Sequence, residues 1–239
     1  MKYDDSWFGI LSKSAFSGLR EYYQKNESLL KSEKGNDLTK IRKKAKAIGK
    51  KHKLSKDEEY GEFSLLEDQH EITYDMFFAN FFRYSVVVLV YLILEDHLNK
   101  FCLALYKEKK LSKPPPKRGS IYKYERYIQR VHLSYDQSVW DFISDLRYIR
   151  NCIVHASGNV SRREPEERSE LDTIVKKDIG IHIGGELAPY RLKPLYLDDD
   201  SIIVEPRYCE TIINSLTTLF ETLCKAAGLQ LEFKVEISE

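Results

Sequence analysis

Three side chains of types that can handle a phosphate group lie within six positions of one another. They are Arg150, Asn151 and His155, in the segment that runs from Asp145 to Gly158. An apolar stripe at helical spacing leads into them, formed by Val139, Ile143, Leu146 and Ile149. A glycine closes the segment, as is common after the last turn of a helix. The pattern predicts a helix end that carries a polar site.

A regular helix over residues 136–155, with Asp136 as its cap, places these side chains relative to one another. Asn151 and His155 are four residues apart and share a face, and Arg150 lies about 140° round the helix from His155. The face shared by Asn151 and His155 lies away from the apolar stripe. Each also has a purely structural interpretation. Arg150 can pair with a surface carboxylate, Asn151 can hydrogen-bond a neighbouring helix, and His155 can offset the helix dipole.

The helices that would position this segment are predicted from hydrophobic periodicity. The longest predicted helix runs from Tyr74 to Lys109, and its middle is apolar nearly all round, so we expect it at the centre of a bundle. Glu95 follows the most apolar portion, either as a surface acid or as a group that supports a nearby site. Further helices are expected near residues 120–131, in the second half of 161–177, and from Pro206 to Gly228.

Alternating apolar and polar residues predict a small amount of β-structure. Residues 179–183 alternate, and residues 195–197 and 201–204 flank three successive aspartates and are expected to form a small hairpin. Residues 229–237 alternate strictly and predict a C-terminal strand. The expected fold is therefore mostly α, an antiparallel helical bundle with a small β-hairpin and a C-terminal strand.

The N-terminal third carries a basic segment, residues 40–56, with nine basic residues and no acidic one. A helix is predicted near residues 15–31, ended by Lys34-Gly35-Asn36, and Asp37 is expected to cap the next one. The basic segment is either a solvated helix face or a surface that contacts RNA phosphates, with Lys43, Lys44, Lys46, Lys50 and Lys51 as the candidate contacts. It contains no aromatic residue on which bases could stack. Residues 57–71 are acidic and would partly neutralise it if the two segments pack together.

Composition bounds the class of protein. The chain has 239 residues, of which 42% are apolar, with 38 basic and 37 acidic residues, so it can bury a core and is not disordered. The four cysteines are scattered without zinc-ligand spacing, so we expect buried reduced thiols, no metal and no cofactor. The longest apolar run, residues 86–94, falls far short of the ~20 residues that span a bilayer. Together with an N-terminus that lacks a signal-peptide pattern, this predicts a cytoplasmic protein with no membrane segment.

The segment Arg150-Asn151-Cys152-Ile153-Val154-His155 resembles the Arg-polar-x3-His signature of HEPN domains. The acidic end of the apolar helix, residues 94–100, is similar to the helix end common in that family. The resemblance covers roughly residues 70–227. It implies a HEPN-like domain at residues 70–239 with an insertion at about 160–205, preceded by an N-terminal helical extension at residues 1–69.

The resemblance implies a metal-independent endoribonuclease of toxin or antiviral-defence type. His155 would take the proton from a 2′-OH of RNA, Arg150 would stabilise charge on the phosphoryl oxygens, Asn151 would assist, and Glu95 would give support from the next layer. HEPN ribonucleases commonly pair two such helices across a two-fold interface, so a homodimer is expected, with an antitoxin or a defence-system protein as a further partner. Within one chain, a long Arg150 would have to curl round, or the helix would have to unwind before His155.

The alternative is a non-catalytic HEPN module that binds nucleic acid or a partner protein through residues 40–56. Many such modules lose the Arg or the His, whereas this chain keeps both. Ser157 stands where toxins silenced by nucleotidyl transfer carry a tyrosine, so that form of control is not expected. The position of the basic segment separates the two hypotheses. A shared face with Arg150 and His155 would favour the nuclease, and a distant position would favour the binding module.

Overall fold

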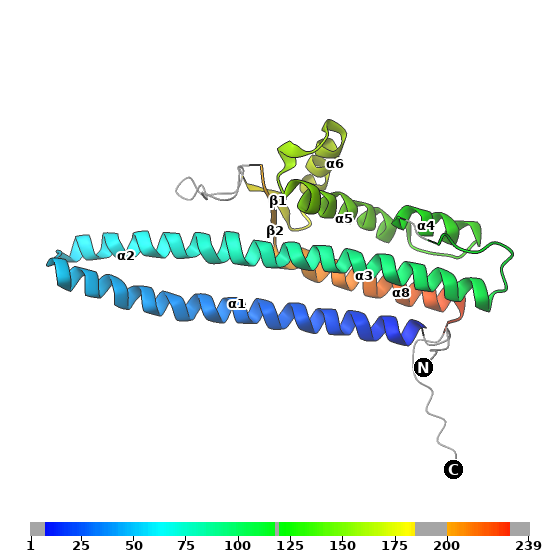
Figure 1. Ribbon diagram of the computed structural model, residues 1–239, viewed down its shortest axis with the longest axis horizontal. Coiled ribbons are helices and arrows are strands. Elements are labelled where there is room, and N and C mark those ends of the chain that lie inside the picture. Colours follow the sequence, from blue (N-terminus) through cyan, green and yellow to red (C-terminus); the bar gives the residue numbers. More distant parts are fainter. Residues whose placement is uncertain (1–7, 118–119, 185–199, 230–239) are drawn as a thin grey trace, which may run out of the picture. The chain divides into compact units, whose positions relative to one another are not determined.

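The computed structural model describes residues 8–117, 120–184 and 200–229, which are mostly helical with a small antiparallel sheet (Figure 1). The predicted fold class is confirmed at this level. The elements are α1 (Phe8–His52), α2 (Lys56–Glu71), a π-helical segment η2 (Ile72–Phe78), α3 (Ala79–Glu108), α4 (Ile121–Arg130), α5 (Gln137–Ala156), a 3₁₀ turn η3 (Val160–Arg162), α6 (Pro165–Lys176), β1 (Ile181–Ile183), β2 (Ile202–Val204) and α8 (Pro206–Ala227).

The chain divides into two compact units, each built from separate stretches of sequence. The bundle unit contains residues 1–21, 87–150 and 210–239, and the sheet unit contains residues 22–86 and 151–209. The division predicted at residues 69 and 70 lies inside α2, within the sheet unit. Helix α5 belongs to the bundle unit up to Arg150 and to the sheet unit from Asn151 onward.

In the bundle unit, the start of α1 packs against α3 and α8 through aromatic rings. The ring of Phe16 lies 5.4 Å from that of Phe220 and 5.3 Å from the imidazole of His97. Arg20 donates a 2.8 Å hydrogen bond to Asn214. Helix α5 buries three of the four residues of its predicted apolar stripe, with Ile143, Leu146 and Ile149 each at most 1% exposed, whereas Val139 is half-buried. The hydrophobic periodicity of α5 therefore predicted its buried face correctly.

In the sheet unit, side chains from one turn of α3 hydrogen-bond the backbone of strand β2. Asn80 donates to the carbonyl of Ile202 at 3.1 Å and accepts from the amide of Val204 at 2.9 Å. Arg83 donates to the carbonyl of Val204 at 3.2 Å, and the hydroxyl of Tyr84 donates to the carbonyl of Ile202. Side chains at i, i+3 and i+4 share a helix face, so this single turn can reach the backbone of both Ile202 and Val204.

The other side of β2 pairs with β1, in the register Ile181↔Val204, His182↔Ile203 and Ile183↔Ile202. The strand predicted at residues 179–183 is confirmed for residues 181–183. Residues 195–197, predicted as the hairpin partner of 201–204, and most of the predicted strand at 229–237 lie outside the described residues.

The prediction of a break at Lys34-Gly35-Asn36 is wrong, because α1 continues through it. Gly35 is exposed, and a glycine inside a helix costs only about 1 kcal/mol relative to alanine. Tertiary bonds within the sheet unit compensate. Lys34 pairs with Asp75, and Asp37, expected to cap a new helix, accepts bonds from Lys40 and from the hydroxyl of Tyr74. Helix α1, with 45 residues, is therefore longer than α3 with 30, although α2, η2 and α3 together run as 53 residues of continuous helix.

The apolar helix α3 is buried along one side and exposed along another. Val86, Val90 and Leu94 are fully buried, whereas Leu89 and Leu92 are 38% and 50% exposed. Residues 56–108 form a run long and apolar enough to cross a membrane by length and composition, with 44% of its most apolar stretch buried. The sequence had indicated burial on all sides, and the structure limits it to part of the circumference.

The turn that carries Asn80 gives a stability prediction. Asn80→Ala removes both bonds to β2 and leaves the buried amide of Val204 without its acceptor, so we expect the free energy of unfolding to fall by about 2–3 kcal/mol. Urea denaturation would measure it. Asn99→Ala is the matched control on the same helix and should change stability by no more than about 0.5 kcal/mol. Equal losses in the two variants would contradict the role of Asn80.

Candidate functional site

The candidate site lies on the last two turns of α5, which remain helical through Ala156. Asp136 begins this helix as predicted, because its carboxylate accepts from the amide of Ser138 at 2.9 Å. The helix does not unwind before His155, so that expectation is wrong. Five residues of regular helix turn through about 140° beyond a full circle, which separates Arg150 and His155 round the axis of one chain.

In the bundle unit, Arg150 lies over one residue of α3, Tyr91, and acts electrostatically on a second, Glu95, one turn further along. Its guanidinium lies over the ring of Tyr91, 5.0 Å from the ring centre, and its charge acts on the carboxyl of Glu95. Tyr91 is buried, and Glu95 and Arg150 are both half-buried. An aromatic face and a carboxylate together restrict a guanidinium to few orientations. The structure thus brings together Arg150 and Glu95, two of the residues selected from the sequence.

The electrostatics of this pair follow from partial burial. Burial raises the pKa of Glu95 above its ordinary value, and the positive charge of Arg150 opposes that rise. Burial also raises the pKa of the Tyr91 phenol, with a smaller contribution from the charge of Glu95. Tyr91 was not selected from the sequence. Its spacing of four residues before Glu95 on a predicted helix was the available signal.

In the sheet unit, His155 is exposed at the end of α5, and Asn151 is half-buried one turn earlier. The helix ends in a left-handed turn, with φ of +55° at Ser157 and +82° at Gly158, and the amide of Gly158 donates to the carbonyl of Cys152 at 3.0 Å. This termination holds the last turn of the helix while leaving the imidazole open to solvent.

Gly158 also allows a close contact that anchors the helix end to α3. A Cβ atom at this position would lie 2.2 Å from the hydroxyl oxygen of Tyr84. The carbonyl of Gly158 accepts from the amide of Ile202 at 2.8 Å, so the helix end is also bonded to β2. The sequence identified Gly158 as a helix terminator, but its second role depends on a tertiary neighbour.

The basic segment lies elsewhere in the sheet unit. Its candidate contacts are exposed on the last third of α1, namely Lys43, Lys44, Lys46, Lys50 and Lys51. The acidic helix α2 packs beside them, with Glu59 against Gly49, as the expected partial neutralisation requires. About 25 residues of continuous helix separate Glu59 from Tyr84, the neighbour of Gly158, which is roughly 35 Å. The basic segment therefore does not adjoin His155 within the unit.

Helix α2 supplies aromatic side chains that the basic segment itself lacks. Arg42, Lys46 and Lys56 line a groove together with Tyr60 and Phe63. The guanidinium of Arg42 lies 5.5 Å from the centre of the Phe63 ring, and the Tyr60 side chain is 72% exposed. Cations and an exposed ring on one surface can contact both phosphates and bases. The sequence alone did not show that these basic and aromatic side chains share a groove, because they come from different helices.

The cysteines are buried free thiols, as predicted. Burial raises the pKa of Cys152 to about 11 and those of Cys102 and Cys224 to about 12, which disfavours reactive thiolates. Within residues 8–117, 120–184 and 200–229 there is no group of three or more His, Cys, Asp or Glu side chains placed to hold a metal ion.

Comparison with protein families, with curated proteins and with solved structures finds no match for this chain.

The contact between Arg150 and Glu95 can be tested by titration. Arg150→Met removes the positive charge that lowers the pKa of the buried Glu95 carboxyl, so that pKa should rise further above its ordinary value. Carbon-13 NMR of the Glu95 carboxyl would follow it, with Glu95→Gln used for assignment. Arg147→Met removes the same charge one turn away and should leave the Glu95 pKa in place. An unchanged Glu95 pKa in Arg150→Met would show that the two groups do not interact.

Proposed function

We propose that this protein is a metal-independent endoribonuclease of toxin or antiviral-defence type, with Arg150 and His155 as its catalytic residues. The observation that carries the proposal is the exposure of His155 and the position of Arg150 on the last turns of α5. An imidazole is exposed on a helix end anchored by Gly158, and a guanidinium five residues earlier lies over the Tyr91 ring and acts electrostatically on Glu95. The resemblance of residues 150–155 to the HEPN signature supports the same activity.

The proposed chemistry uses only groups of the protein and of RNA. A neutral His155 accepts the proton of a 2′-OH while that oxygen attacks the adjacent phosphorus. The bond from phosphorus to the 5′-oxygen breaks, and a protonated imidazole returns a proton to the leaving oxygen. Arg150 stabilises the charge that builds on the phosphoryl oxygens, and Asn151 hydrogen-bonds the imidazole or a phosphate oxygen. The products carry a 2′,3′-cyclic phosphate and a 5′-OH, and no cofactor is needed.

The intact helix favours a site shared by two chains. With Arg150 and His155 about 140° apart on regular helix, one helix end presents only one of them to a given phosphate. Two copies of α5 related by a two-fold axis would let the arginine of one chain face the histidine of the other. The proposal therefore includes a homodimer in the cytoplasm, with an antitoxin or a defence-system protein as a further partner.

The position of the basic segment favours a second candidate, a non-catalytic module that binds nucleic acid or a partner protein. The lysines of residues 40–56 lie roughly 35 Å along the helix from the level of Gly158, and they share their surface with Tyr60. In this case binding would take place at the α1–α2 end of the sheet unit, and the α5 end would be structural.

Cleavage of a mixed-sequence RNA in the presence of EDTA tests the first candidate. The native chain should cut and leave cyclic phosphate ends, whereas His155→Asn and Arg150→Ala should each reduce the rate by at least about 100-fold, because each removes a group that acts on the reacting atoms. His132→Asn is the matched control, since His132 is also exposed and its replacement should leave the rate unchanged.

Mixing the two inactive chains tests the shared site. Dimers that combine His155→Asn with Arg150→Ala contain one complete pair, so the mixture should regain part of the native rate. Equal cleavage by the native chain and His155→Asn would exclude His155 as a catalytic group. A folded dimeric native chain that cuts no RNA would favour the binding module.

Binding of RNA should depend on the basic segment in both candidates. Lys43→Ala with Lys44→Ala should weaken RNA binding. The slope of log K against log salt concentration is negative, and its magnitude should decrease by about 0.7 for each phosphate of single-stranded RNA that the variant no longer neutralises. Fluorescence anisotropy with a labelled RNA at several salt concentrations would measure this. Lys225→Ala on α8 is the control and should change neither quantity. A slope equal to that of the native chain would exclude Lys43 and Lys44 as groups that bind phosphate.

A further inference from the structure

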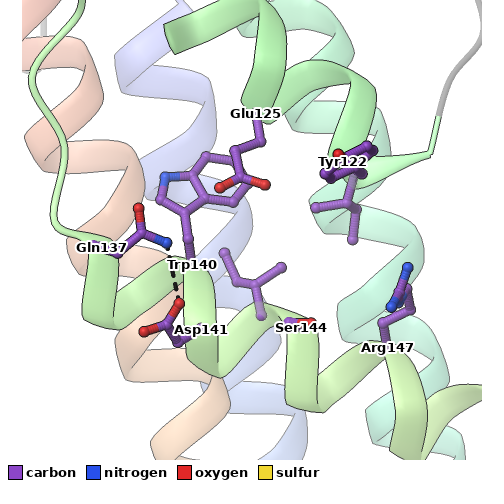
Figure 2. A pocket seen from close by; sticks show the side chains of 9 residues that line it. Tyr122, Glu125, Gln137, Trp140, Asp141, Ser144 and Arg147 are labelled. Carbon is purple, nitrogen blue, oxygen red and sulfur yellow. Dashed lines mark hydrogen bonds between the residues drawn. The ribbon is translucent and has the colours of Figure 1, made fainter. Parts of the chain in front are cut away.

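A cavity of about 330 Å³ lies between α4 and α5 in the bundle unit, on the half of α5 before Arg150 (Figure 2). Its size falls within the range of small-molecule sites. The wall combines acidic, amide, aromatic and cationic side chains, namely Tyr122, Glu125, Gln137, Trp140, Asp141 and Arg147. Ile121, Ile143 and Ser144 complete it.

Two carboxylates share one side of the cavity. The amide of Gln137 donates to Asp141 at 3.0 Å, and both residues line the cavity together with Glu125. Burial and the nearby charge of Asp141 raise the pKa of Glu125. In the described part of the chain neither carboxylate has an ion-pair partner. This side therefore presents negative charge that a cationic ligand would neutralise.

Aromatic side chains form another part of the wall. Trp140 is 3% exposed, and within the described residues its indole Nε1 has no hydrogen-bond partner. The Tyr122 ring is half exposed, and the guanidinium of Arg126 lies 4.2 Å from its centre, which fixes the ring on the rim. Aromatic surfaces bind organic cations as well as apolar chains, so this wall suits an alkyl chain that ends in a cation.

Arg147 lies at the opposite side from the acids. Figure 2 shows Glu125, Gln137 and Asp141 together and Arg147 apart from them, with Ser144 between. Asp141 and Arg147 are six residues apart on α5, a rise of about 9 Å. The lining thus carries two negative charges at one end and one positive charge at the other.

We infer that this cavity binds a free basic amino acid, arginine or lysine, with its side-chain cation between Glu125 and Asp141 and its carboxylate on Arg147. The charges of such a ligand mirror those of the lining, and its alkyl chain would lie along Trp140 and Tyr122. A guanidinium or ammonium donates to two carboxylates at once, and a guanidinium of the protein matches a carboxylate. A nucleotide fits less well, because its phosphates would meet a lining that is negative overall.

Binding can be followed through the fluorescence of Trp140, with Trp7→Phe removing the other tryptophan of the chain. L-arginine or L-lysine should change the signal saturably. L-citrulline, which lacks the cation, and agmatine, which lacks the carboxylate, should each bind at least about tenfold more weakly than arginine, because neither can form one of the two charge-assisted interactions. None of these readouts depends on RNA cleavage.

Conservative variants identify the groups that bind. Glu125→Gln and Asp141→Asn should each weaken arginine binding by at least about tenfold, whereas Glu221→Gln on α8 should not change it. Arg147→Met should weaken arginine binding but leave agmatine binding in place, a difference that a merely structural role would not produce. Circular dichroism would confirm that each variant is folded. The inference is overturned if arginine and lysine give no saturable change up to about 10 mM, if citrulline binds as well as arginine, or if Glu125→Gln binds like the native chain.

Discussion

The sheet unit depends on the way one turn of α3 satisfies the exposed edge of a very short strand. A two-stranded sheet leaves one edge of each strand without a partner strand, and buried backbone groups cannot remain unpaired without a large loss of stability. Here Asn80, Arg83 and Tyr84 supply the bonds that a third strand would supply, to Ile202 and Val204. Because these bonds come from a helix, the strand can lie directly on it.

The same turn also connects more distant parts of the chain. Arg83 bonds to the carbonyl of Val204 and pairs at 2.7 Å with Glu27, which is 6% exposed, so α1 is tied to α3 and β2 by one buried charge pair. Removing one member of such a pair leaves a buried charge without compensation, which strongly destabilises a protein. Tyr84 bonds to Ile202 and lies against Gly158, so the end of α5 is held by the same network.

Helix α5 therefore has three different environments along its length. Its first half lines a cavity of mixed charge, its middle buries an apolar stripe in the bundle unit, and its last turns expose His155 beyond a guanidinium that lies on Tyr91. The buried stripe fixes the rotation of the helix about its axis, because Ile143, Leu146 and Ile149 cannot leave the core without loss of apolar burial. This rotation leaves Asn151 and His155 on the face away from the stripe, whereas Arg150, seven residues after Ile143, lies half-buried on the stripe side.

The sequence by itself determined the elements whose signals are local. The period of the apolar residues in α5, the cap at Asp136 and the terminator at Gly158 gave that helix nearly to the residue, because each signal acts within one or two turns. Proline at the start and glycine after the end did the same for α8. Arg150, Asn151 and His155 could be selected on residue type and spacing alone.

Only the tertiary structure decided features that depend on partners distant in sequence. Gly35 did not break α1, because bonds from Lys34 to Asp75 and from Tyr74 to Asp37 join α1 to η2 on either side of the glycine. The position of Glu95 beside Arg150, the second role of Gly158 and the mixed lining of the cavity also arise between helices. A local pattern specifies which face a helix buries, whereas the neighbour that meets each exposed or half-buried side chain is set by the packing of the whole chain.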